Sequence, residues 1–321
     1  MSSHLSSHSS STHLQEKIQA NGITIAYESV GPKDGETVLL IGGTGNQLID
    51  WPVELVEELV RRGFRVVRFD NRDAGLSTKF TEAGYPDSAA IKSALEKGLP
   101  APIPYSLGDM AGDCAGLLKA LGIRKAHLVG VSMGGAIAQL AAIDHPECTF
   151  SLTLLMTDSG NPEIPIVAKP EIFAALPPIP PEGDVAGYVE YNIISNKLLS
   201  SPGFPTEDAV IRDRVQRGVD RSYEPAGLAR QQTAIFIDYY LNANHRHENL
   251  KNIKVPTIVV QGVDDPIVSI ESARDITDNI PGAELILIPG LGHDLPTQLI
   301  STFADAITRA AQRSGNLNET T

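Results

Sequence analysis

The sequence contains few cysteines, and it has no long uninterrupted apolar segment. Its two cysteines, Cys114 and Cys148, show no Cys-x-x-Cys spacing, so neither a disulfide framework nor a cysteine-based metal site is expected. No apolar run approaches the roughly 18 residues that cross a bilayer, and the start of the chain lacks the features of a secretory signal. We therefore expect no membrane partner and a cytoplasmic location.

Basic residues are also scarce relative to acidic ones. The chain has 26 Lys and Arg against 39 Asp and Glu, which gives a formal net charge of −13. Such a surface repels phosphate backbones and anionic lipid headgroups, so nucleic acid is not an expected partner. The hydrophobic fraction of 42% is nevertheless that of a chain that folds around a sizeable core. Nothing in the sequence indicates the oligomeric state.

The chain divides into five segments by composition. Residues 1–15 are rich in Ser and His and residues 314–321 are polar, so both are expected to be disordered tails, without a fixed metal site. Between them, residues 16–156 and 249–313 are expected to form two parts of one α/β core. Residues 157–248 interrupt that core.

Within the core, short apolar runs alternate with helical patterns. Strands are expected at Ile23–Val30, Thr37–Ile41, Arg65–Phe69, His127–Val129, Leu152–Met156, Thr257–Gln261 and Glu284–Ile288. Helices are expected at Pro52–Arg62, Leu107–Leu121, 134–144 and Ile270–Asn279, and after Pro296. Parallel strands need a crossover long enough for a helix. The alternation therefore predicts the α/β class, with a doubly wound and mostly parallel sheet.

The interrupting segment has a different pattern. It begins with Pro-rich loops and continues with apolar residues at helical spacing, such as Val185, Val189 and Ile193. We interpret residues 157–248 as a helical cap over the carboxyl edge of the sheet, where open α/β folds bind ligands. The alternative is a packing appendage with no part in catalysis.

The strongest local signal is Gly130-Val131-Ser132-Met133-Gly134-Gly135, between an expected strand and an expected helix. A serine on such a sharp strand-to-helix turn is held in a strained conformation, and the positions two residues away must lack a Cβ. The Gly-x-Ser-x-Gly pattern is weak by itself, but its position between strand and helix adds weight. Ser132 is the predicted nucleophile.

A serine hydroxyl needs a base to accept its proton. His293 lies in Pro289-Gly290-Leu291-Gly292-His293-Asp294, directly after the last expected strand, where functional side chains are commonly found. The other seven histidines fall in the first tail, at a strand start, at a helix end or in a charged turn. His293 is therefore the predicted base.

The imidazole needs an acceptor at its second nitrogen. Asp265 follows the expected strand Thr257–Gln261 and precedes Pro266, and it is our choice for this acid. Asp264 and Asp158 are the alternatives, since each also follows an expected strand. The order of serine, aspartate and histidine along the chain is that of the α/β-hydrolase arrangement.

Attack on a carbonyl creates an oxyanion, which preorganised amides stabilise. One amide is expected from Met133, the residue after the predicted nucleophile. The second is expected from Thr44, in the glycine-rich loop Gly42-Gly43-Thr44-Gly45-Asn46.

These motifs resemble those of the α/β-hydrolases over residues 20–312. Besides the segments above, Asp70-Asn71-Arg72-Asp73-Ala74-Gly75-Leu76-Ser77 is similar to the D-x-R-x-x-G-x-S turn of that family. Within it, the Gly-Gly loop, this turn and the GLGHDLP segment are most similar to aclacinomycin methylesterase-type enzymes, which cleave a carboxylic methyl ester from a polyketide. The resemblance implies an α/β-hydrolase fold and an esterase.

The predicted function is hydrolysis of a small to medium hydrophobic carboxylic ester through an acyl-enzyme. Ser132, His293 and Asp265 would form the triad, and neither a metal nor an organic cofactor is required. A cofactor-free perhydrolase or haloperoxidase-like enzyme would carry the same triad. A ligand-binding protein could also retain these residues without turnover, and the sequence leaves both alternatives open.

Overall fold

The computed structural model describes residues 15–165, 167, 169–241 and 243–318. The expected first tail therefore lies outside the described residues except for its last position, and so do residues 319–321 of the expected second tail. The end of the chain differs from expectation. Helix α11 runs from Ile300 to Asn318, so residues 314–318 are helical and the predicted start of the tail at 314 is wrong. Ser314 is buried, and its hydroxyl donates to the Ala311 carbonyl oxygen, so the last turns remain attached to the packed part of the helix.

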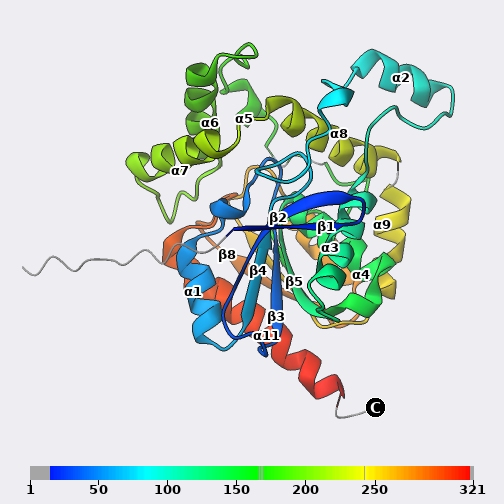
Figure 1. Cartoon of the computed structure of the whole chain (residues 1–321), viewed down its shortest axis with the longest axis vertical. Coiled ribbons are helices and arrows are strands. Elements are labelled where there is room, and N and C mark those ends of the chain that lie inside the picture. Colours follow the sequence, from blue (N-terminus) through cyan, green and yellow to red (C-terminus); the bar gives the residue numbers. More distant parts are fainter. Residues whose placement is uncertain (1–14, 166, 168, 242, 319–321) are drawn as a thin grey trace, which may run out of the picture.

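An eight-stranded sheet occupies the centre of the molecule (Figure 1). Its order is β1 (Glu16–Ala20), β2 (Ile23–Val30), β4 (Arg65–Phe69), β3 (Thr37–Ile41), β5 (Ala126–Val131), β6 (Thr149–Leu155), β7 (Thr257–Gly262) and β8 (Glu284–Ile288). The pairs β1/β2 and β2/β4 are antiparallel, whereas all pairs from β4 to β8 are parallel. The predicted α/β class with a mostly parallel sheet is confirmed.

Helices cover both faces of this sheet (Figure 1). One face packs on α1 (Val53–Arg61) and α11, and the other packs on α3 (Leu107–Ala120), α4 (Met133–Asp144) and α10 (Ile270–Asn279). Successive side chains of a strand point to opposite faces. In β3, Val38 and Leu40 accordingly join the first core, whereas Leu39 and Ile41 join the second. A strand covered on both faces reads as a continuous apolar run, which is why β3 is visible in the sequence.

The segment between β6 and β7 is helical. It contains α5 (Glu171–Ala174), α6 (Val185–Leu199), α7 (Asp208–Arg221), α8 (Pro225–Leu241) and α9 (Ala243–Asn249). In Figure 1, α5 to α8 lie together beyond one end of the sheet, whereas α9 lies beside α4. Helices α6 and α7 share a small apolar cluster of their own, formed by Val189, Ile193 and Ile211.

Two elements have no counterpart in the sequence prediction. Strand β1 is a polar edge strand that pairs only with β2 among the described strands, so it lacks the apolar run by which the other strands are recognised. Helix α2 (Ser88–Glu96) is capped by Asp87, whose carboxylate accepts from two backbone amides, and Ile91 is its one buried residue among those described. Both elements carry too little apolar pattern to be predicted.

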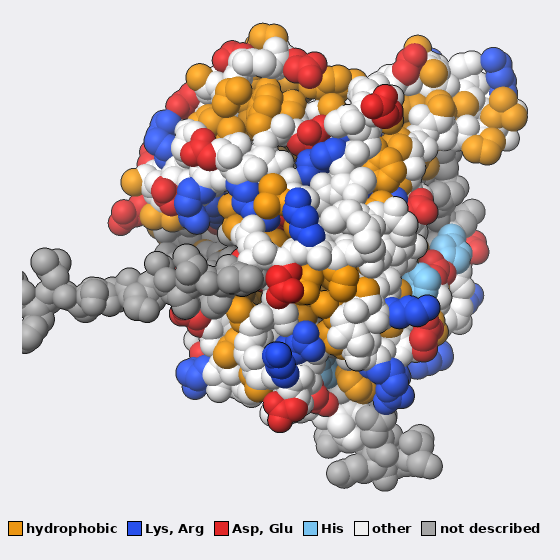
Figure 2. Space-filling view, in the orientation of Figure 1, with side chains coloured by type: hydrophobic (Ala, Val, Ile, Leu, Met, Phe, Trp, Pro, Cys, Tyr) orange, Lys and Arg blue, Asp and Glu red, His pale blue; other side chains and the backbone are white. Residues whose placement is uncertain are grey.

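The surface is uneven in character. Figure 2 shows apolar side chains gathered around α6, whereas charged side chains are interspersed over the body of the sheet domain. Exposed apolar residues of this region include Ile179, Val185, Ile194 and Val210. None of the helices in the described part of the chain combines the length and the apolar character that crossing a membrane requires.

Candidate active site

Ser132 stands between β5 and α4 in a left-handed backbone conformation, with φ 53° and ψ −124°. The chain is crowded around it. A Cβ atom at position 130 would lie 2.1 Å from the Gly134 carbonyl oxygen, and one at position 134 would lie 2.1 Å from the Ile41 carbonyl oxygen. Since real Cβ atoms do not approach so closely, both positions require glycine, as the sequence pattern predicts. The turn thereby holds the Ser132 hydroxyl at the N-terminus of α4.

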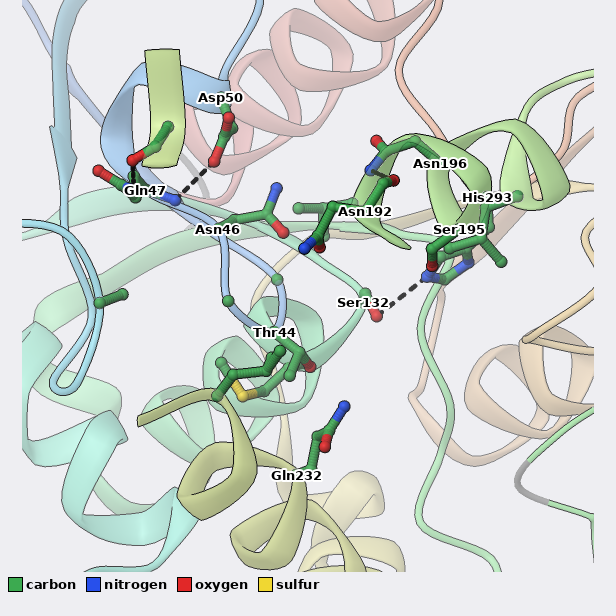
Figure 3. A pocket seen from close by; sticks show the side chains of 18 of the residues that line it. Thr44, Asn46, Gln47, Asp50, Ser132, Asn192, Ser195, Asn196, Gln232 and His293 are labelled. Carbon is green, nitrogen blue, oxygen red and sulfur yellow. Dashed lines mark hydrogen bonds between the residues drawn. The ribbon is translucent and has the colours of Figure 1, made fainter. Parts of the chain in front are cut away.

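The structure brings the three predicted triad side chains together. His293 follows β8 and Asp265 follows β7, so both lie at the carboxyl edge of the sheet together with Ser132. The His293 Nε2 atom is 3.1 Å from the Ser132 Oγ atom, and Nδ1 is 2.9 Å from the Asp265 Oδ2 atom. The dashed line in Figure 3 marks the hydrogen bond between His293 and Ser132. With the Nδ1 proton donated to the carboxylate, Nε2 is free to accept the serine proton.

The Asp265 carboxylate is fixed by further donors. Its side chain is fully buried. The Oδ1 atom accepts from the Ile267 and Val268 amides at 2.8 and 2.9 Å, and Oδ2 accepts from Gln261 Nε2 at 3.1 Å. This set of donors orients the carboxylate toward the imidazole.

The two alternative acids lie elsewhere. The Asp264 Oδ2 atom accepts from the Gly290 amide at 2.8 Å, so this carboxylate holds the loop that precedes His293. The Asp158 Oδ1 atom accepts from Arg246 at 2.8 Å. Of the three candidates, Asp265 is the one in contact with the imidazole.

The predicted oxyanion loop follows β3 and lines the same cavity as Ser132, together with Met133. Met133 is the first residue of α4, so its amide has no acceptor within the helix. In the loop, the Gly45 amide is already bound to the Gln231 Oε1 atom at 2.7 Å and the Asn46 amide to the Gly43 carbonyl oxygen at 3.2 Å. Thr44 and Ser132 line the same cavity, and both are labelled in Figure 3.

Gln231 is a site-supporting residue that the sequence did not reveal. It is fully buried on α8, and its Nε2 atom donates to the Arg72 carbonyl oxygen at 2.7 Å while Oε1 accepts from Gly45. The side chain thus connects α8, the Arg72 turn and the oxyanion loop. Its contacts join residues 159 and 186 positions apart in the chain, and no local pattern encodes such a pairing.

The chain after α6 supports the His293 loop in a similar way. The His293 amide donates to the Leu199 carbonyl oxygen at 2.8 Å. Ser201 is buried, its hydroxyl accepts from the Gly292 amide at 2.9 Å and donates to Asp294 Oδ1, and its own amide donates to the same carboxylate oxygen at 3.1 Å. Burial raises the pKa of Asp294 above its ordinary value, and these Ser201 donors act in the opposite direction. The end of α6 and the residues that follow it therefore hold both His293 and the preceding Gly292.

Buried ion pairs join the inserted helices to the core. Arg230 of α8 binds both oxygens of Asp73 at 2.7 and 2.8 Å, and Tyr105 donates to the same carboxylate at 2.7 Å. Burial disfavours the charged carboxylate, but the hydrogen bonds from Arg230, the Phe80 amide and Tyr105 hold the pKa of Asp73 below its ordinary value. Arg246 of α9 is fully buried; it pairs with Asp158 and Asp238 inside the inserted segment, and it donates to the Gln139 Oε1 atom of α4 at 3.2 Å.

The candidate site opens into a cavity of about 540 Å³. Ser132, His293, Thr44 and Met133 line it, and α6, α7 and α8 supply much of the remaining wall. Among the described residues, no group of three or more His, Cys, Asp or Glu side chains is arranged to hold a metal ion.

The curated relatives that match most of this chain include esterases. Rhodomycin D methylesterase DauP from Streptomyces sp. (strain C5) is 28% identical over 318 residues, covering 92% of this chain and 98% of the relative. The bifunctional esterase/perhydrolase DCH from Acinetobacter calcoaceticus is 24% identical over 310 residues, covering 88% of this chain and 94% of the relative.

Solved structures agree on the fold. A meta-cleavage product hydrolase from Pseudomonas fluorescens IP01 superposes with a TM-score of 0.69 at 19% identity, covering 95% of this chain and 98% of the other. Residues 38–306 match the sequence model of the alpha/beta hydrolase family. Since this match includes all the parallel strands and the segments that carry Ser132, Asp265 and His293, the chain belongs to the alpha/beta hydrolase family.

Proposed function

We propose that this protein is a serine esterase that hydrolyses carboxylic esters through an acyl-enzyme. The observation that carries the proposal is the continuous hydrogen-bonded line from Ser132 Oγ through the His293 ring to the Asp265 carboxylate. The methylesterase and esterase/perhydrolase relatives support ester hydrolysis as the reaction class.

In the proposed mechanism, Ser132 Oγ attacks the ester carbonyl carbon while His293 Nε2 takes the hydroxyl proton. The negative oxygen of the tetrahedral intermediate receives hydrogen bonds from the Thr44 and Met133 amides, with the N-terminus of α4 adding a favourable dipole. His293 returns the proton to the alcohol oxygen as the carbon–oxygen bond breaks. Water, deprotonated by His293, then attacks the acyl-enzyme and releases the acid.

We propose in addition that residues 157–248 form a cap over this site. Support comes from the cavity, whose wall includes residues of α6, α7 and α8, from the buried ion pair of Arg230 with Asp73, and from the hydrogen bond of Arg246 to Gln139 of α4. Apolar side chains such as Leu228 and Ile235 line one side. A cavity of about 540 Å³ suits a small to medium ester with a hydrophobic part.

The function is tested by an activity screen across methyl, aryl and lactone esters with the purified protein. Steady turnover of at least one class is expected, and Ser132→Ala should remove it. A single burst followed by no further product would instead indicate a binding protein that is acylated once. Activity that survives Ser132→Ala would contradict the mechanism.

A second candidate reaction is perhydrolysis, which the similarity to the esterase/perhydrolase from Acinetobacter calcoaceticus favours. Hydrogen peroxide would replace water in attacking the acyl-enzyme and would release a peracid. Measuring the carboxylic acid and the peracid formed from one ester in the presence of peroxide gives the ratio of hydrolysis to perhydrolysis. Peracid as the main product would make perhydrolysis the principal activity.

We expect Ser201→Ala to lower kcat about 10- to 100-fold with little change in KM. The substitution removes the hydroxyl hydrogen bonds to Gly292 and Asp294, which fix the His293 loop, and small displacements of a catalytic group greatly slow the reaction. The Gly292 amide loses its acceptor and the Asp294 carboxylate loses one of its two Ser201 donors, which should also lower the free energy of unfolding by about 1–3 kcal/mol. Steady-state kinetics and urea unfolding measure the two effects. Ser200→Ala is the matched control, since among the described residues the Ser200 hydroxyl, at the C-terminal cap of α6, bonds to the Asn196 carbonyl oxygen and not to the His293 loop. Equal kinetics for the two variants would refute the role of Ser201.

A further inference from the structure

The cavity has two walls of unlike chemistry. On one side, α6 presents Asn192, Ser195 and Asn196, and α7 adds Arg214. Figure 3 shows the three α6 side chains on the same side of Ser132 as His293, while Thr44 and Gln232 lie on the other side. The second wall, formed by α8 and its neighbours, includes the apolar residues Leu107, Met133, Leu228 and Ile235 together with Gln232, while Leu199, Val215 and Val219 add apolar surface beside the polar residues of α6 and α7.

The polar wall has hydrogen-bonding capacity that the protein leaves unused. Asn192 donates to the Tyr188 carbonyl oxygen at 2.7 Å through Nδ2, which leaves its Oδ1 atom available. Asn196 donates to the Asn192 carbonyl oxygen and accepts from Arg214 at 2.7 Å. Within the described residues, Asn192 Oδ1 and the Ser195 hydroxyl have no hydrogen-bond partner. Polar groups of a pocket that bond to nothing in the protein are available to a ligand.

Hydroxyl groups fit this wall better than an ion of either sign. The Arg214 cation lies near the carboxylates of Asp50 and Asp294, so the wall carries opposite charges close together. Asn192 Oδ1 can only accept a hydrogen bond, Arg214 can only donate, and Ser195 can do both. An alcohol hydroxyl both donates and accepts, and so satisfies each of these groups. An apolar group placed here would leave them desolvated and unpaired, which strongly disfavours its binding.

The position of His293 indicates which part of an ester faces this wall. The His293 amide is bound to the last residue of α6, at the Leu199 carbonyl oxygen, whereas the Gly45 amide of the oxyanion loop is bound to Gln231 of α8. The carbonyl oxygen of the ester must point to the oxyanion amides, and the leaving alcohol oxygen must reach the imidazole that protonates it. The alcohol part of the ester therefore lies toward α6.

We propose that the α6 wall is a specificity subsite for a hydroxylated alcohol, so that the preferred substrates are apolar acyl esters of a polyol or sugar. This inference rests on the proposed serine-esterase function and adds the class of leaving group to it. Asn192 and Ser195 supply the decisive contacts with the hydroxyl groups.

The test compares two esters with one acyl chain, glucose 6-octanoate and cyclohexylmethyl octanoate, whose alcohols share a six-membered ring and differ in their hydroxyl groups. The wild-type protein should show kcat/KM about tenfold higher for the glucose ester, as two retained hydrogen bonds predict. Equal values, or a preference for the cyclohexylmethyl ester, would overturn the subsite. Turnover of 4-nitrophenyl octanoate with neither alkyl ester cleaved would overturn the subsite alone, whereas absence of all ester turnover would overturn the esterase as well.

Two variants separate recognition from general damage. Asn192→Leu combined with Ser195→Ala should reduce the preference for the glucose ester to below about twofold, while kcat/KM for the cyclohexylmethyl ester stays the same or rises. Ser195→Ala alone should give an intermediate preference, and it keeps the test valid if the double variant folds poorly. Asn252→Leu is the surface control, because Asn252 is exposed and bonds only to Asn249. A preference that survives the double variant would refute the assignment of these residues.

Discussion

Replacing Ser132 by alanine is expected to lower the steady-state rate of ester hydrolysis by about 10⁴-fold or more, with the fold intact. The change removes the one oxygen that the His293 Nε2 atom contacts in this site, at 3.1 Å, and leaves the backbone turn without a nucleophile. The Ser132 hydroxyl makes no other side-chain contact by hydrogen bond in the described structure, so the free energy of unfolding should change by less than about 1 kcal/mol. Initial rates and thermal unfolding measure both quantities.

The role proposed for Asp265 as the acid has a sharper test, since a matched neighbour, Asp264, is available. Asp265→Asn should lower kcat by about 10⁴-fold, because an amide in this place no longer fixes the imidazole tautomer or stabilises its charged form. Asp264→Asn makes the same chemical change one residue earlier, on a carboxylate that bonds to the Gly290 amide instead of the imidazole. It should reduce kcat far less. A larger loss of kcat in Asp264→Asn than in Asp265→Asn would instead assign the role of the acid to Asp264.

The parts of the site that the sequence predicts are those that depend on local geometry. Ser132 is recognisable because its turn requires glycine two residues away on either side, and this requirement is met in the structure. Asp265 and His293 are recognisable because each follows an apolar strand, and the carboxyl ends of parallel strands meet at one edge of the sheet. Local rules and chain topology together are enough to bring these segments close.

The parts that the sequence does not predict depend on pairings between distant residues. Gln231 and Ser201 hold the oxyanion loop and the His293 loop, yet each is an ordinary polar residue in its own segment. The polar edge strand β1 is likewise defined by its partner β2 instead of by its own apolar pattern. Such contacts become visible only when the inserted helices are placed against the sheet.

A large effect on stability is expected where α8 packs against the core. Arg230→Met should lower the free energy of unfolding by about 3–5 kcal/mol, because it leaves the Asp73 carboxylate buried without its cation. Both side chains are almost completely buried, at 1% and 0% relative exposure, so water cannot replace the lost partner. Urea unfolding near neutral pH measures the change. Arg212→Met is the control, because its ion pair with Glu190 is exposed to water and contributes little to stability.

The difference in the free energy of unfolding between wild type and Arg230→Met should depend on pH, because the pKa of Asp73 is lowered in the folded protein. A carboxyl group with a depressed folded pKa contributes stability above its unfolded value of about 3.9, and that contribution is lost as the pH falls through the folded value. The gap between wild type and Arg230→Met should therefore be largest near neutral pH and shrink in acid.

Since Gln231, the next residue on α8, holds the proposed oxyanion loop at Gly45, Arg230→Met should also lower kcat. If Arg230→Met were as stable as Arg212→Met and kept its kcat, the ion pair of Arg230 with Asp73 would not be what positions α8 over the site.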